Sequence, residues 1–287
     1  MARGDFHLHS TASDGVQSPA WVVETAAANG VEVLALTDHD TTEGLGEARV
    51  AATRLGLRLI PGIELSTDMG TADVHLLAYG LDVQSAQFQG YLSWLRESRT
   101  GRAGKIVEVL ASLGAPISLK RVFEIAGEAS VGRPHIARAL VEAGHATSVQ
   151  DAFDRFLANN GPADVPRAKL SPQQAIDEVH AAGGVIFVAH PLFIGAAALA
   201  GTIEQLAAWG LDGIETFYKH YSPDQVASHA ALGRRLGLAL SGGSDYHGLG
   251  NPDDRAIGEI PFPDDGVAAF VTFIEGRCAD SGLERRA

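Results

Sequence analysis

The stretch Ser171–His190 reads SPQQAIDEVHAAGGVIFVAH and contains one complete structural unit of this chain. Its opening Ser-Pro-Gln-Gln is a capping box, in which serine and glutamine side chains satisfy the free N–H groups of a new helix. Gly183 can adopt the left-handed conformation that ends a helix. The apolar run Val185–Ala189 then predicts a buried strand, with His190 directly at its carboxyl end.

The same order of helix, glycine and strand recurs along the chain, which predicts an α/β protein with a parallel sheet. One of these helices is expected to begin at Thr202. An opening strand at Asp5 and another at Val74–Tyr79 bring the count to a closed or nearly closed barrel. An open doubly wound sheet is the alternative, although no G-x-G-x-x-G loop follows the first strand. The other expected strands are Val31–Thr37, Leu57–Ile63, Val185–Ala189, Gly213–Thr216 and Leu238–Leu240.

The middle of the chain departs from this order, because no strand-like run occurs between Ala86 and about Ala158. Its apolar residues instead recur with helical spacing. We therefore expect a barrel formed by residues 1–83 and 166–287, with a small helical domain, residues 84–165, inserted into it. The helices expected there are Tyr91–Arg102, Lys105–Leu113, Leu119–Ala126, Pro134–Ala143 and Val149–Leu157.

Charge separates the same two parts of the chain. Residues 84–169 contain 11 Lys or Arg and 8 Asp or Glu, whereas the remainder contains 11 and 27, within an overall net charge of −13. An acidic body argues against broad coating of nucleic acid. A basic insert suits a substrate that is itself a small anion. The plainer alternative is a solvated surface on which charge is unevenly distributed.

Composition is typical of a globular protein in a reducing compartment. The single cysteine, Cys278, excludes an internal disulfide framework and a thiolate metal cage. The N-terminus has no apolar run of the signal-peptide type. The longest apolar stretch, Val185–Gly201, is interrupted by His190 and Pro191, so we expect no membrane span. We expect a cytoplasmic protein without an obligate protein partner.

Histidines and carboxylates recur at the carboxyl ends of the predicted strands, where the chemistry of parallel barrels collects. In an extended segment His7 and His9 point the same way and Leu8 points into a core. Imidazole and carboxylate ligands without thiolate suit Mn, Zn or Fe(II). Because one or two ions need fewer ligands than this set offers, two or three ions are implied. The nine candidate ligands are His7, His9, Asp14, His39, Glu64, His75, His190, Asp245 and His247.

Five motifs resemble those of the polymerase and histidinol phosphatase (PHP) family. The resemblance covers residue 5 to about residue 250. It implies a distorted (β/α)7 TIM-like barrel that hydrolyses phosphate esters at a trinuclear metal centre. The motifs are DFHLHS at 5–10, ALTDHD at 35–40, PGIE at 61–64, VAHP at 188–191 and GSDYH at 243–247.

The resemblance also implies how the ligands are shared, with Glu64 bridging two ions. We expect two to three divalent ions, with Mn(II) first and Zn(II) or Fe(II) as alternatives. The three implied sites are His7, His9, Glu64 and Asp245; Glu64, His75 and His190; and Asp14, His39 and His247.

A motif in the insert, VGRPHIA at 131–137, resembles that of PHP phosphoesterases that act on nucleotides. These include nucleoside 3′,5′-bisphosphate phosphatases and a 5′-to-3′ exoribonuclease. Pro134 would begin a helix, where free N–H groups and the helix dipole favour an anion. We therefore expect Arg133 and His135 to act in catalysis or in phosphate binding. The candidate phosphate-binding residues are Arg133, His135, Arg167 and Lys169.

The expected reaction is metal-dependent removal of the 3′-phosphate from a nucleoside 3′,5′-bisphosphate such as adenosine 3′,5′-bisphosphate. The insert would hold the 5′-phosphate. His220, which follows the strand Gly213–Thr216, is placed to face the substrate or to protonate the leaving group. The alternatives are 5′-to-3′ exonuclease action on short oligonucleotides, histidinol phosphate hydrolysis and nucleotide binding without turnover. A carbon–nitrogen hydrolase of the amidohydrolase type is less well matched. Such sites often use a bridging lysine, and no lysine precedes Lys105 in this chain.

Overall fold

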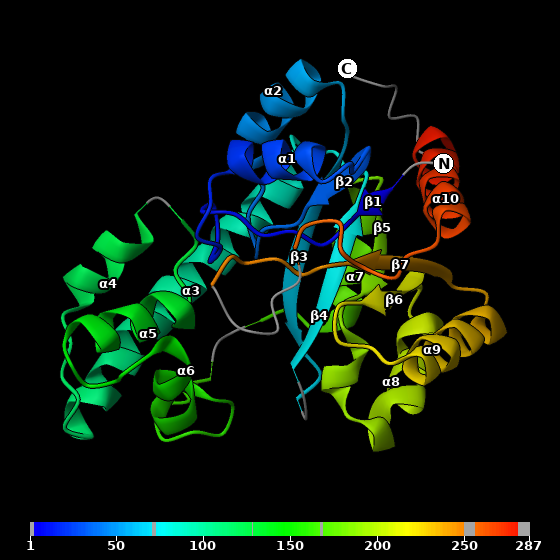
Figure 1. Cartoon of the computed structure of the whole chain (residues 1–287). Helices are drawn as coiled ribbons and strands as arrows, with labels where there is room; N and C mark the ends of the chain where they lie inside the picture. The colour runs from blue at the N-terminus through cyan, green and yellow to red at the C-terminus, as the bar shows by residue number, and fades with distance from the viewer. Residues whose placement is uncertain (1–2, 71–72, 128, 167–168, 250–255, 281–287) are drawn as a thin grey trace.

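Seven strands form a barrel in the computed structural model of this chain, and helices surround it (Figure 1). The hydrogen-bonded order of the strands follows their order in the sequence. The structure describes residues 3–70, 73–127, 129–166, 169–249 and 256–280. The strands are β1 (Gly4–Asp5), β2 (Val33–Leu36), β3 (Arg58–Asp68), β4 (Asp73–Tyr79), β5 (Val185–Val188), β6 (Gly213–Tyr218) and β7 (Ala239–Gly243).

The segment that follows β1 closes the barrel against the end of β7. The N–H of Phe6 donates to Gly242 O at 3.2 Å, and the N–H of Asp245 donates to His7 O at 2.8 Å. A parallel bridge between Leu8 and Tyr246 extends this pairing. The expectation of a closed or nearly closed seven-stranded barrel is therefore confirmed.

Strand β4 runs antiparallel to both of its neighbours, β3 and β5, so the expectation of a purely parallel sheet was wrong. Only residues 69–72 separate β3 from β4, and a parallel neighbour requires a crossover of a dozen residues or more. The reversal has a functional consequence. It places the first half of β4, with His75, at the barrel end where the parallel strands finish.

Capped helices cover the outside of the barrel. The hydroxyls of Ser18, Ser171 and Ser222 each accept a hydrogen bond from the third helical N–H, and each serine precedes a proline. One expected start was wrong, because the fourth helix of the set begins at Ala196 and not at Thr202. The alanines at 196–198 are strong helix formers that extend it backwards. These helices are α1 (Pro19–Ala28), α2 (Leu45–Leu55), α7 (Pro172–Ala181), α8 (Ala196–Ala208) and α9 (Pro223–Leu236).

A final helix, α10 (Asp264–Asp280), was not anticipated. Its buried Phe270 packs on Phe6, with ring centroids 4.3 Å apart. Buried Val267 lies against Gly4 at the start of β1. The helix therefore covers the end of the barrel at which the parallel strands begin.

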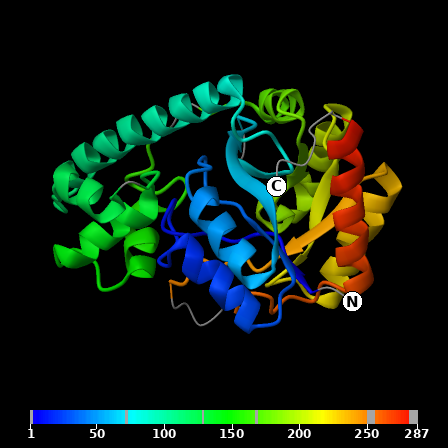
Figure 2. The same cartoon turned by 90° about the horizontal axis from the view of Figure 1, so that it is seen from above.

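A single long helix, α3 (Ala86–Ser112), replaces the two helices expected at 91–102 and 105–113 (Figure 2). Leu92 and Leu95 pack in the core of the barrel, whereas Ile106 and Leu110 pack in the core of the insert. Burial at both ends outweighs the cost of internal glycines, which is about 1 kcal/mol each. Neither α3 nor any other helix of the described residues is long and apolar enough to cross a membrane.

The helical segment that follows has a hydrophobic core of its own, formed by buried residues between Ala103 and Ala163. We infer that the insert folds around this core as the small domain that the sequence predicted. Figures 1 and 2 both show it as a lobe at one side of the barrel. Its elements after α3 are α4 (Leu119–Ala126), α5 (Arg133–Glu142), α6 (Val149–Ala152) and the π-helical turn η1 (Phe153–Leu157).

Candidate metal centre

All nine candidate ligands lie at one end of the barrel. His7 and His9 flank the fully buried Leu8, and their rings are 5.1 Å apart, so both face the barrel mouth as strand alternation predicts. Eight of the nine fall into overlapping groups whose nitrogen and oxygen atoms lie within 4.8 Å of one another. These groups are His7, His9, Glu64 and Asp245; His9, Asp14, His39 and His247; and His39, Glu64 and His75.

The carboxylate of Glu64, on β3, stands at the centre of these groups and is almost fully buried. Its Oε2 lies 3.1 Å from Nε2 of both His7 and His9, and 3.3 Å from His39 Nδ1. Its Oε1 lies 2.9 Å from His75 Nδ1 and 3.0 Å from His190 Nε2. Burial opposes ionisation, but the surrounding imidazoles, first His39 and His7, hold the pKa of Glu64 well below its usual range.

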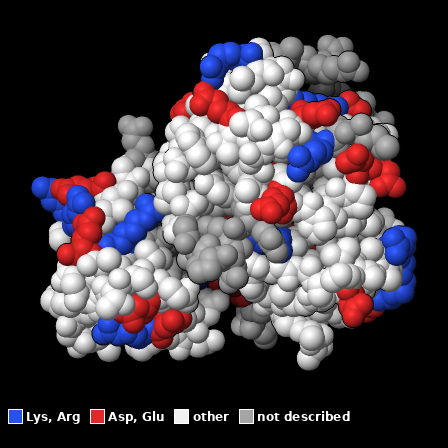
Figure 3. All heavy atoms as spheres, in the orientation of Figure 1, with Lys and Arg blue, Asp and Glu red and all other residues white. Residues whose placement is uncertain are grey.

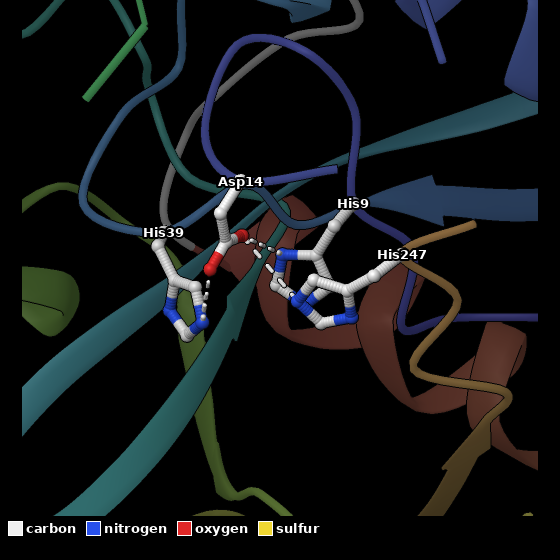
Figure 4. A group of neighbouring side chains, drawn as sticks. All are labelled: His9, Asp14, His39 and His247. Carbon is white, nitrogen blue, oxygen red and sulfur yellow. Dashed lines mark ion pairs between the residues drawn. The ribbon is translucent and has the colours of Figure 1, made fainter. Parts of the chain in front are cut away.

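Asp14 is the centre of a second group, shown in Figure 4. Its Oδ1 lies 3.3 Å from His247 Nε2 and 3.9 Å from His9 Nδ1, and its Oδ2 lies 4.0 Å from His39 Nε2. The carboxylate therefore faces His39 on one side and the other two rings on the other (Figure 4). The expected trio of Asp14, His39 and His247 comes together, and His9 joins it.

The carboxylate of Asp245 lies beside the Nε2 atoms of both His7 and His9. Its Oδ1 lies 3.3 Å from His7 Nε2 and 3.2 Å from His9 Nε2. Its Oδ2 accepts a hydrogen bond from the hydroxyl of Tyr218 at 2.8 Å, and Lys219 Nζ donates to its backbone oxygen. Nδ1 of His9 thus faces Asp14 and Nε2 of His9 faces Asp245, so His9 belongs to two groups.

Buried imidazole nitrogens show that this cluster fits metal ions. Among the described residues, both ring nitrogens of His9 and Nδ1 of His39 are buried and have no hydrogen-bond partner, although carboxylate oxygens are close. A buried polar atom without a partner is costly, and a metal ion would satisfy these lone pairs. Imidazole and carboxylate ligands suit Mn, Zn or Fe(II). The groups are therefore able to bind metal ions.

Sequence reasoning missed the buried carboxylate of Glu215 on β6, which supports two of the candidate ligands. Its Oε1 lies 2.9 Å from His7 Nδ1, and its Oε2 accepts from the backbone N–H of His190 at 2.5 Å. Alternation along β6 was the available signal, because a glutamate on an inward face of a buried strand needs a partner.

Two of the candidate ligands have an unusual backbone conformation. His190 has φ 27° and Asp245 has φ 49°, values that residues other than glycine rarely adopt. Such strain persists where surrounding structure fixes it and is concentrated at functional sites. Here the His190 N–H is held by Glu215 and the Asp245 N–H by His7 O. This backbone conformation directs both side chains toward the other candidate ligands.

A cavity of about 200 Å³ separates the barrel mouth from the insert. Asp14, His39 and His75 line it on the barrel side, so it opens directly onto the candidate ligands. Four cations also line it. Two of them were expected, Arg133 and Lys169, and two were missed, Arg99 and Arg102 of α3, because nothing local shows which face of α3 meets the barrel.

The four cations differ in how their charge is neutralised. Arg99 pairs with Asp40, Arg102 with Asp164 and Lys169 with Asp73. Arg133 donates instead to neutral acceptors, Leu157 O at 3.0 Å and Asn159 Oδ1 at 2.7 Å. Burial and the nearby charge of Arg102 lower the pKa of Arg133. An anion in the cavity would therefore be matched best by the Arg133 guanidinium.

Two arginines on the outer surface of the insert are paired with acids. Arg121 pairs with Glu142 and with Glu124, and Arg155 pairs with Asp151. On the face shown in Figure 3, blue and red side chains lie side by side on this lobe. Acidic side chains therefore neutralise the charge of these two surface arginines, whereas Arg133 in the cavity donates to neutral acceptors.

His135 and His220 are not members of the clustered groups. His135 is buried and its Nδ1 accepts from the Gly132 N–H, which caps α5, and it does not line the cavity. Burial lowers the pKa of His135 to about 4. His220 is exposed after β6, with its ring 5.5 Å from that of Tyr218. Arg167 lies outside the described residues.

Clustered imidazole and carboxylate groups beside a cavity lined with cations fit the class of metal-dependent phosphoesterases. Two proteins that are similar to this chain have names that fit this class. A 5′-3′ exoribonuclease of Haemophilus influenzae is 36% identical over 245 residues, 85% of this chain and 89% of that protein. A 3′,5′-nucleoside bisphosphate phosphatase of Chromobacterium violaceum is 33% identical over 253 residues, 87% of this chain and 89% of that protein.

A solved structure from Bifidobacterium adolescentis, classed as a metal-dependent phosphoesterase, superimposes with a TM-score of 0.85. Its sequence is 32% identical, and the match covers 96% of this chain and 97% of that one. The model of the PHP domain matches residues 5–111. The chain belongs to the PHP family, as its motifs predicted.

Proposed function

We propose that this protein removes the 3′-phosphate from a nucleoside 3′,5′-bisphosphate, giving a nucleoside 5′-monophosphate and inorganic phosphate. The observation that carries the proposal is the cavity lined by Arg133 on one side and by Asp14, His39 and His75 on the other. A substrate with two phosphates would place one at the candidate metal centre and the other against Arg133. The relative from Chromobacterium violaceum carries the name of this activity.

The nine clustered residues are proposed to hold two to three divalent ions, with Mn(II) first and Zn(II) or Fe(II) as alternatives. Glu64 would bridge two of them, since five imidazoles face its two oxygens. Bound ions would supply Lewis-acid polarisation of the phosphoryl oxygens and acidify the attacking water.

The residues of the chain contribute orientation and charge. Arg133 would bind the 5′-phosphate through two N–H groups, which fixes the distance from that phosphate to the reacting one. Arg99, Arg102 and Lys169 would lie around the 5′-phosphate, each still paired with its own aspartate. Tyr218 and Lys219 hold Asp245 in place. His220 stays a prediction as the group that faces the substrate or protonates the leaving 3′-oxygen.

A second candidate is 5′-to-3′ exoribonuclease activity, favoured by the relative from Haemophilus influenzae. The two reactions break the same bond. In each, water adds to phosphorus, the P–O3′ bond breaks, and the 3′-oxygen leaves as the hydroxyl of a 5′-phosphorylated nucleoside. They differ only in whether the phosphorus carries a further nucleotide.

The test is phosphate and nucleotide release by chelator-stripped protein to which Mn(II) is restored. Adenosine 3′,5′-bisphosphate, AMP, histidinol phosphate and a 5′-phosphorylated pentanucleotide would be compared. The proposal predicts the highest kcat/KM for the bisphosphate, with AMP as its product. A preference for the pentanucleotide selects the exonuclease, a preference for histidinol phosphate overturns both, and metal binding without turnover of any substrate identifies a binding module.

A further inference from the structure

Phe193 is the most exposed phenylalanine or tryptophan among the described residues, at 64%. It lies in the 3₁₀ turn η2 (Pro191–Ile194), directly after the candidate ligand His190. Its ring is 5.0 Å from the ring of His190 and 6.3 Å from that of Tyr218, edge-on in both cases. An exposed aromatic ring at the edge of a catalytic centre offers a flat apolar face to whatever enters.

The turn that carries Phe193 is fixed at several points. The N–H of His190 donates to Glu215, and the N–H of Leu192 donates to the hydroxyl of Tyr221 at 3.1 Å. The N–H of Phe193 itself donates to His190 O. Both supporting side chains are buried. The exposed ring is therefore displayed on a braced turn, and stacking on it would cost little ordering of the chain.

Two candidate ligands connect the ring to the basic cavity. His75 lines the cavity, and its ring is 5.2 Å from that of His190, whose own ring contacts Phe193. The contacts thus run from the cavity through His75 and His190 to Phe193. In Figure 1, α5 of the insert and α8, the helix that follows η2, lie on opposite flanks of the barrel.

The ring of Tyr218, which Phe193 contacts, is itself buried, and so is most of the Lys219 side chain beside it. Lys219 Nζ lies 5.8 Å from the centre of the Tyr218 ring, and the ring of exposed His220 lies 5.5 Å from it. Aromatic rings beside positive charge are the combination that binds single-stranded nucleic acid, with bases stacking and phosphates following the charge. We define the exposed rings of Phe193 and His220, which both lie against the buried ring of Tyr218, as the aromatic ledge.

We propose that the aromatic ledge binds the base of the nucleotide that follows the scissile phosphate, with Phe193 as the stacking residue. The inference rests on the proposed function, because it needs the 5′-phosphate of the first nucleotide in the cavity. A substrate that ends at the 3′-phosphate leaves the ledge empty, whereas a 5′-phosphorylated dinucleotide fills it. The ledge is thus a specificity site that extends the enzyme from bisphosphates to short single-stranded oligonucleotides.

The test compares three substrates with the Mn(II)-loaded full chain: adenosine 3′,5′-bisphosphate, the dinucleotide pApA, and the same dinucleotide with an abasic second residue. Wild-type protein should prefer pApA over its abasic analogue by about tenfold in kcat/KM, as expected for one stacked base. Phe193→Ala should abolish that preference and leave hydrolysis of the bisphosphate within about twofold, since the lost contact is worth only the stacking term. Phe193→Trp should restore the preference.

Trp94→Ala is the matched control, because Trp94 is 40% exposed and lies on α3, outside the residues that line the cavity. It should leave all three rates unchanged. A Phe193→Ala variant that keeps the preference, or that loses activity equally on all three substrates, overturns the ledge and makes Phe193 a support for His190. Wild-type protein that hydrolyses neither dinucleotide nor bisphosphate overturns the proposed function, and the ledge with it.

Discussion

Glu215 Oε1 lies 2.9 Å from His7 Nδ1, and both side chains are fully buried. The other oxygen of the same carboxylate accepts from the backbone of His190. One buried group of β6 therefore orients candidate ligands in the segments that follow β1 and β5. If Nδ1 of His7 donates to Glu215, Nε2, which lies beside Glu64 and Asp245, would be the nitrogen available to a metal ion.

Replacing Glu215 by glutamine should weaken metal binding without unfolding the barrel. The amide keeps the shape but removes the charge that fixes the His7 tautomer, and losses of about 10- to 100-fold in metal affinity are typical of such supports. Calorimetric titration of chelator-stripped protein with Mn(II) measures the effect. Glu204→Gln, on the surface of α8 where Glu204 pairs with Arg235, is the control. Equal affinity in the two variants would show that Glu215 is only a packing residue.

Adding Mn(II) to stripped protein should raise its melting temperature. The buried nitrogens of His9 and His39 lack partners in the described structure, so ions that bind only the folded state stabilise it. At 100 times the Kd the gain is about 2.7 kcal/mol per site, or roughly 5–10 °C for a chain of this size. Differential scanning calorimetry gives the shift, and the same melting temperature with and without Mn(II) would contradict the metal assignment.

Asp14→Ala tests the group shown in Figure 4. Removing its carboxylate should lower the metal content by one ion and reduce kcat at a fixed Mn(II) concentration, because His39 and His247 lose the oxygen between them. Elemental analysis of the desalted protein counts the ions, and His247→Ala should behave alike. Full metal content in both variants would remove this group from the centre.

His229, on α9, lies outside the set of candidate ligands. We expect it to make the free energy of unfolding depend on pH in the acid range. It is almost fully buried beside the ring of Tyr221, and burial lowers its pKa. The unfolded chain therefore takes up the proton first as the pH falls below about 6.5. The contribution of neutral His229 to the free energy of unfolding is therefore complete above about pH 6.5 and is lost as the pH falls below it.

The substitution His229→Phe keeps an aromatic ring but cannot be protonated. Its melting temperature should rise relative to wild type as the pH is lowered from about 7.5 to 5, the window below the ordinary histidine pKa. Thermal unfolding followed by circular dichroism at several pH values provides the comparison. Two curves that stay parallel over this range would show that His229 does not contribute the term.

The candidate ligands could be predicted because parallel strands bring their carboxyl ends together, whatever the details of packing. His7, His9 and His190 follow from that rule alone. His75 reached the same end for another reason, since β4 is reversed. Arg99 and Arg102 could not be found, because their place in the cavity depends on how α3 bridges two hydrophobic cores. Long-range packing sets that relation, and no local spacing encodes it.

Arg133 provides the sharpest test of the two-phosphate arrangement. It faces the cavity bonded to neutral acceptors, whereas its cationic neighbours are paired with aspartates. Arg133→Ala should raise KM for adenosine 3′,5′-bisphosphate by about 10- to 100-fold, the loss expected for charge-assisted hydrogen bonds. KM for an aryl phosphate, which has no second phosphate, should change little.

Two further variants separate recognition from general charge. Arg133→Lys keeps the charge but not the paired N–H groups, so it should recover only part of the loss. Arg121→Ala removes a surface arginine of the same insert that is paired with Glu142, and it should leave both KM values unchanged. If Arg133→Ala weakened both substrates equally, the second phosphate would have to bind elsewhere, and the cavity would lose its role in choosing bisphosphates over monoesters.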